Sequence, residues 1–128
     1  MRIKGEWFLQ YDEGKWIGPL LNTMDALGLA RLAQHFETLP ACYIAVGAAT
    51  EVYRKAVGSV IRSDNLIRFR TVFSPVEGNG SHTWLELFSD ATEASGSGTR
   101  INHLDQIFSK ALGQVLNIEC RLTFQQGV

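Results

Sequence analysis

The segment VLNIECRLTF, residues 115–124, alternates apolar with polar side chains along its length. Every second side chain of a β-strand points to the same face of its sheet. One face of this segment is therefore apolar at five successive positions, which are Leu116, Ile118, Cys120, Leu122 and Phe124. The pattern predicts a long strand that covers a hydrophobic core.

Three other stretches also carry strand patterns. LIRFRTVF, residues 66–73, alternates after a turn-forming Ser-Asp-Asn, and predicts a hairpin strand whose polar face holds Arg68 and Arg70. ACYIAVG, residues 41–47, is a nearly continuous apolar run between proline and glycine, which indicates a strand in the interior of a sheet. Residues 5–18, which surround the turn sequence Asp-Glu-Gly, predict a short N-terminal β-hairpin.

Residues 22–40 have a different period. Their apolar side chains recur at spacings of three and four, which is typical of an amphipathic helix. Asn22 is a suitable N-cap, and Asp25 would place a negative charge in the first turn. Leu39 and Pro40 would end the helix, because the residue before a proline disfavours the helical conformation.

These elements predict an α+β fold, in which one N-terminal helix packs on a mainly antiparallel sheet or sandwich of six to eight strands. We expect a single domain over residues 1–128, with residues 1–20 as a hairpin contact element and residues 21–128 as the helix and β core. The predicted core combines apolar positions of the helix and the strands: Leu27, Ala30, Phe36, Ile44, Val46, Phe69, Phe73, Ile118, Leu122 and Phe124.

The composition favours an ordinary globular protein. With 45% apolar residues, the chain can form a core without disulfides or metal. Its net charge of -1 gives no general attraction to nucleic acid or to anionic membranes, so neither is an expected partner. Cys42 and Cys120 lie among apolar residues, and we expect both to be buried and reduced. The charged first residues do not resemble a secretory signal, which favours a cytoplasmic origin.

No arrangement of acid, base or nucleophile matches a known catalytic pattern. His82 and Glu86 lie in a strand-like segment, where their spacing would place them on one face about 13 Å apart. Ser81 and Asp90 complete the residue types of a triad, but the sequence context of a nucleophile elbow is missing. We therefore expect no enzyme activity, catalytic residue, cofactor or metal site. The polar side chains of the types that catalysis uses are His35, His82, His103, Glu77, Glu86, Asp90 and Asp105.

Basic residues are concentrated between positions 54 and 70, where five of them oppose one acid, Asp64. The charged face of this segment lacks interleaved aromatic residues, which argues against nucleic-acid binding. We predict a protein interface that could pair with acidic residues Glu77, Glu86 or Asp90 of a neighbouring copy. The predicted interface residues, including two N-terminal tryptophans, are Arg54, Lys55, Arg62, Arg68, Arg70, Trp7 and Trp16.

Seven short sequence blocks follow one another along the chain in a characteristic order. They are LARLA at 29–33, YIAVG at 43–47, EVYRKAV at 51–57, residues 65–73, EGNG at 77–80, ELF at 86–88 and residues 116–124. In this order the blocks resemble small structural proteins of tailed-phage and prophage tail modules, and they are similar to the N-terminal collar region of phage tail fibres. Glu51 and Arg54 fit the E-x-x-R pattern of that group, whereas Glu86 stands where the group usually has glycine.

The resemblance implies a virion structural protein of a tail fibre, collar or baseplate, without a catalytic residue to carry over. Such a protein would form homo-oligomers and dock to other tail or baseplate proteins. It would reside in the host bacterial cytoplasm during assembly and then in the virion tail.

Two alternatives remain open on the residues alone. The chain could be a carbohydrate-binding module of a host-recognition apparatus, with Trp7, Trp16 or Trp84 as a stacking platform for a sugar. A small-molecule enzyme is the third possibility, and it would require a pocket that the sequence does not reveal.

Overall fold

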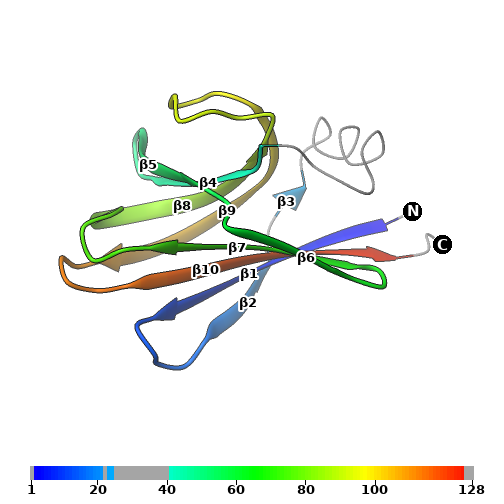
Figure 1. The fold of residues 1–128 in the computed structure, drawn as a ribbon, viewed down its shortest axis with the longest axis horizontal. Coiled ribbons are helices and arrows are strands. Elements are labelled where there is room, and N and C mark those ends of the chain that lie inside the picture. The colour runs from blue at the N-terminus through cyan, green and yellow to red at the C-terminus, as the bar shows by residue number, and fades with distance from the viewer. Residues whose placement is uncertain (1, 22, 25–40, 126–128) are drawn as a thin grey trace.

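The computed structural model describes residues 2–21, 23–24 and 41–125, which form two packed antiparallel sheets (Figure 1). Sheet A has the strand order β2-β1-β10-β7-β6, and sheet B has the order β3-β9-β8-β4-β5. The strands of sheet A are β1 (Arg2–Tyr11), β2 (Ile17–Leu21), β6 (Ser59–Ser63), β7 (Leu66–Phe73) and β10 (Leu116–Gln125). Those of sheet B are β3 (Thr23–Met24), β4 (Tyr43–Gly47), β5 (Glu51–Ala56), β8 (Gly80–Ser89) and β9 (Thr99–Lys110).

Strand β10 lies at the centre of sheet A, between β1 and β7. It pairs with β1 from Tyr11 opposite Leu116 to Arg2 opposite Gln125. Its five predicted inward side chains are all buried, which confirms the alternation of residues 115–124. Strand β1 contributes the fully buried Trp7 to the same core, so the N-terminal hairpin is an integral part of sheet A.

The chain passes from sheet B to sheet A between β5 and β6. At this corner the backbone N–H of Gly58 donates to the carbonyl of Arg70 on β7 over 2.8 Å. The hydroxyl of Thr71 donates to the carbonyl of Ala56 over 3.1 Å. Strand β5 therefore lies at an edge of sheet B, and it contacts sheet A at several points. Lys55 Nζ donates to the carbonyl of Val72 over 2.7 Å, and the Tyr53 ring packs edge-on against that of Phe73, with 5.2 Å between the ring centres.

The predicted α+β class is wrong. Ten strands and no helix are found in the ranges that the structure describes, so the fold is a β-sandwich with more strands than the six to eight expected. Of the predicted helix, only Thr23–Met24 lies in these ranges, and it forms β3 opposite His103 and Asn102. The hairpin predicted at the Ser-Asp-Asn turn is confirmed, and it joins β7 to the edge strand β6, whose five residues are all exposed.

The core joins both sheets. Seven of the predicted core residues lie in it: Ile44, Val46, Phe69, Phe73, Ile118, Leu122 and Phe124. Leu27, Ala30 and Phe36 lie outside the described residues. Cys42 and Cys120 are both buried and are not joined by a disulfide, as predicted, and burial raises the pKa of the Cys120 thiol to about 12.

Replacing Phe69 by alanine should lower the free energy of unfolding by about 3–5 kcal/mol, because the ring is fully buried and its loss leaves a cavity. The matched control is Val60→Ala, at the position paired with Phe69 on β6, where the side chain is 53% exposed. Urea denaturation of both variants checks the assignment. A loss below about 1 kcal/mol for Phe69→Ala would show that this ring is not part of a packed core.

Candidate functional site

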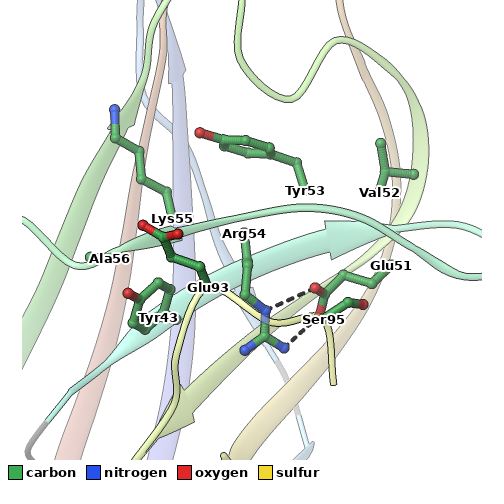
Figure 2. Close-up of a pocket in the computed structure, with 9 residues that line it drawn as sticks. All are labelled: Tyr43, Glu51, Val52, Tyr53, Arg54, Lys55, Ala56, Glu93 and Ser95. Carbon is green, nitrogen blue, oxygen red and sulfur yellow. Dashed lines mark hydrogen bonds and ion pairs between the residues drawn. The ribbon is translucent and has the colours of Figure 1, made fainter. Parts of the chain in front are cut away.

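A cavity of about 580 Å³ lies along the edge strand β5 (Figure 2). It is lined by Tyr43, Glu51, Val52, Tyr53, Arg54, Lys55, Ala56, Glu93 and Ser95. Figure 2 shows Tyr53 and Lys55 on one side of β5, and Arg54 with Tyr43 and Glu93 on the other. Residues from both faces of β5 thus line the cavity. Among the described residues, the only strand that pairs with β5 is β4.

A β-bulge brings Glu51 and Arg54 together on the outer side of β5. Residues three apart in a regular strand point to opposite faces. Here Tyr53 pairs with Val46 and Glu51 pairs with Gly47, so Val52 is an extra residue. This insertion turns Glu51 to the face of Arg54. The E-x-x-R pattern therefore encodes an ion pair across a bulge.

All three nitrogens of the Arg54 guanidinium donate hydrogen bonds to neighbouring groups. Its Nε and Nη2 donate to the two carboxylate oxygens of Glu51 over 2.8 and 2.7 Å. Its Nη1 donates to the carbonyls of Ser97 and Thr92 over 3.0 and 3.2 Å, and the group lies 4.7 Å from the centre of the Phe88 ring. Burial alone would raise the pKa of Glu51, but the hydrogen bonds from Arg54, Ser95 and the Gly96 backbone, together with the charge of Arg54, outweigh it and lower that pKa. We call this arrangement the Arg54 clamp, because it holds the loop at residues 92–97 against β5.

A second polar cluster fixes the other side of β5. Glu77 accepts hydrogen bonds from Lys55 Nζ over 2.6 Å, from the Tyr53 hydroxyl over 2.7 Å and from the backbone N–H of Ser74 over 2.8 Å. These bonds, that from Lys55 foremost, lower the pKa of Glu77 to about 2. Burial and the neighbouring Glu77 carboxylate raise the pKa of Tyr53 to about 12. Both sides of β5 are thus held rigidly.

The free edge of β5 presents backbone groups to the solvent. The N–H of Val57 donates to the carbonyl of Cys42 over 2.9 Å. In an antiparallel pair, alternate residues face the partner strand, so Tyr53 and Lys55 direct their backbone groups toward β4. Arg54 and Ala56 direct theirs away from it, and the carbonyl of Ala56 meets the Thr71 hydroxyl.

On the outer face of sheet B, His103 lies between two carboxylates. Its Nδ1 is 2.8 Å from Glu86 and its Nε2 is 2.7 Å from Asp105. Arg100 also donates to Glu86, over 2.7 Å. Burial alone would lower the pKa of His103, but the hydrogen bonds to Asp105 and Glu86 outweigh it, so the pKa lies above its usual value. The protonated ring is the form that can donate to both carboxylates.

The other two histidines that the sequence offers for catalysis are His82 and His35. His82 is buried, with its Nε2 2.7 Å from the carbonyl of Gly78 and its ring 5.0 Å from that of Phe108. The expectation that His82 and Glu86 share a face is wrong: the His82 ring packs on Phe108 of the core, whereas Glu86 pairs with Arg100 and His103 on the outer face of sheet B. His35 lies outside the described residues. No group of three potential metal ligands occurs in the described part of the chain.

The predicted basic interface does not form one continuous patch. Arg54 is buried in its clamp and Lys55 is bound by Glu77, both on β5 of sheet B. The other three basic residues, Arg62, Arg68 and Arg70, lie on β6 and β7 of sheet A. The proposed acidic counterparts Glu77 and Glu86 already have internal cationic partners, whereas Asp90 is exposed.

The three tryptophans differ in their surroundings. Trp7 is fully buried in the core, so it cannot form the expected contact surface. Trp84 is partly buried and donates its indole N–H to the carbonyl of Ala48 over 2.8 Å. Trp16 is 44% exposed and lines a second cavity, on sheet A, together with Gln10 and Asn117, which sequence reasoning had not singled out.

Comparisons with known proteins yield no relative: no protein-family model, curated protein or solved structure matches this chain. Within the described ranges, no helix has the length and apolar character needed to span a membrane.

Replacing Glu51 by alanine should cost on the order of 3 kcal/mol of folding stability, because it leaves the buried Arg54 guanidinium without its carboxylate. Glu93→Ala is the matched control, since Glu93 lines the same cavity but is exposed, and it should change stability by less than about 0.5 kcal/mol. Urea denaturation measures both effects. Equal losses in the two variants would show that the clamp does not stabilise the fold.

His103 should make stability depend on pH. Because its folded-state pKa lies above 6.5, the protonated ring stabilises the fold fully below that pH, and this contribution is lost as the pH rises through the folded-state pKa. The difference in unfolding free energy between the native protein and His103→Gln should therefore shrink from about pH 6 to about pH 9. A difference that stays constant over this range would contradict the paired arrangement of His103.

Proposed function

We propose that this chain is a structural protein of a phage or prophage tail, in a fibre, collar or baseplate, which acts by docking to copies of itself and to neighbouring tail proteins. The observation that carries the proposal is the open, rigidly held edge of β5 beside its 580 Å³ cavity. An exposed edge is a template for a strand from another chain, with backbone hydrogen bonds supplying affinity and side-chain pockets supplying specificity.

Rigidity makes such an edge suitable for assembly. The Arg54 clamp and the Glu77 cluster fix β5 from both sides before any partner arrives. Less conformational freedom is then lost on docking, which favours association. Val52, the extra residue of the bulge, is 52% exposed and lines the cavity with an apolar side chain.

The blocks that carry the sequence resemblance fall on these elements. EVYRKAV forms β5 and supplies Arg54 and its carboxylate partner, and EGNG supplies Glu77. Their polar residues serve internal pairing and leave the strand edge exposed, as a scaffold for assembly requires. This correspondence supports a docking role over substrate turnover.

The proposal is tested in particles induced from the strain that encodes the chain. We expect mass spectrometry to find the chain in purified particles and immunogold labelling to place it on the tail. Recovery of the chain only in the soluble cell fraction, with none in particles, would overturn the proposal.

The role of the β5 edge is tested separately by Val52→Lys, which places a charge at the docking strand and should sharply reduce incorporation into particles. Val76→Lys is the control, because Val76 is exposed in the loop after β7. Equal incorporation of both variants would contradict docking through β5.

A further inference from the structure

A second cavity, of about 550 Å³, lies on sheet A and reaches Lys55 and Ala56 at the end of β5, which also line the first cavity. Val72, Asn117 and Gln10 are register partners on the adjacent strands β7, β10 and β1, so their side chains lie in one row on the outer face. Trp16, Ser59 and Arg70 also line this cavity. With strands about 4.8 Å apart, the row spans about 10 Å. We call it the Trp16 groove.

Trp16 offers an apolar platform at this groove. Its side chain is 44% exposed, whereas Trp7 is buried and Trp84 is engaged with the backbone at Ala48. A large exposed ring with a polar edge is suited to a ligand that has both an apolar face and hydroxyl groups. Sugar rings have this character.

The amides in the groove are held in fixed orientations. Asn117 donates from Nδ2 to Gln10 Oε1 over 3.0 Å and to the carbonyl of Asp12 over 3.3 Å. Gln10 donates from Nε2 to the carbonyl of Gly14 over 2.8 Å. No described residue donates to Asn117 Oδ1, so this oxygen can accept a hydrogen bond from a ligand hydroxyl. The polar floor is therefore organised before binding.

The charge of the groove favours an anionic ligand. Among the described residues that line it are two cations, Lys55 and Arg70, and no carboxylate. Lys55 is bound to Glu77, but Arg70 uses only its Nε, on Glu119, and no described residue accepts from its two terminal nitrogens. Glu119 is shared with Arg121, so it does not neutralise both arginines. A carboxylate matches the free end of a guanidinium.

We infer that the Trp16 groove binds an acidic oligosaccharide, in which one sugar ring lies on Trp16, its hydroxyls bond to Gln10 and Asn117, and a uronate carboxylate pairs with Arg70. This function goes beyond docking through β5. Lys55 and Ala56 line both cavities, but the ligand contacts inferred here are made by residues outside β5. It would give a tail protein a contact with acidic glycans on a cell surface.

Isothermal titration calorimetry with hexagalacturonate and with a hyaluronan hexasaccharide tests the inference, with neutral chitohexaose and the oligonucleotide dT6 as comparisons. We expect saturable binding of at least one acidic sugar that weakens with salt, and weaker or no binding of chitohexaose and dT6. Trp16→Ala and Arg70→Gln should each weaken binding by about tenfold or more. In Arg70→Gln, Arg121 still pairs with Glu119, which favours a folded variant.

The matched controls are Leu112→Ala, an exposed apolar residue in the loop after β9, and Arg62→Gln on β6. Circular dichroism verifies that each variant is folded. Failure of both acidic sugars to bind, tighter binding of dT6, or undiminished binding by both Trp16→Ala and Arg70→Gln would each overturn the inference. None of these outcomes bears on incorporation into particles, so the two proposals fail independently.

Discussion

The burial of the apolar face of β10 is the constraint on which the rest of the structure depends. β10 is the central strand of sheet A, and its side chains Leu116, Ile118, Cys120 and Leu122 meet the core that both sheets share. A shift of one residue in its register would send all of these side chains to solvent. The long pairings with β1 and β7 follow from that alternation, and they join the N- and C-terminal strands side by side (Figure 1).

The outer faces and edges carry the polar chemistry. On sheet A, Glu119 is buried between Arg70 and Arg121, and Arg121 lies 4.1 Å from the centre of the Phe8 ring. On sheet B, the extra residue of β5 creates the pair of Glu51 and Arg54. The bulge of β5 thus brings together charged groups that a regular strand would separate, whereas Glu119 meets Arg70 through regular cross-strand pairing. The two candidate surfaces differ accordingly: one is a rigid edge, and the other is a groove with a free guanidinium end.

Strand alternation could be predicted from the sequence, but departures from it could not. Regular patterns correctly indicated β4, β7 and β10 and the burial of Phe69 and Cys120. The predicted α+β class was wrong because it depended on a helix at residues 22–40 that would pack on the sheet. Thr23–Met24, at the start of this segment, form a strand. The role of E-x-x-R was missed because spacing alone assigns residues three apart to opposite faces of a strand. A single sequence carries no clear signal for a bulge. The Trp16 groove could not be predicted either, because its residues come from segments that are distant in the sequence.

The central claim is that the edge of β5 is a docking strand, and hydrogen–deuterium exchange of its backbone amides tests this most directly. In the isolated chain, the amides of Arg54 and Ala56 should exchange rapidly, and those of Tyr53 and Lys55, which face β4, should exchange slowly. In purified tails, the account predicts that Arg54 and Ala56 become protected as well. Rapid exchange of these two amides in both the isolated chain and the assembled tail would contradict it.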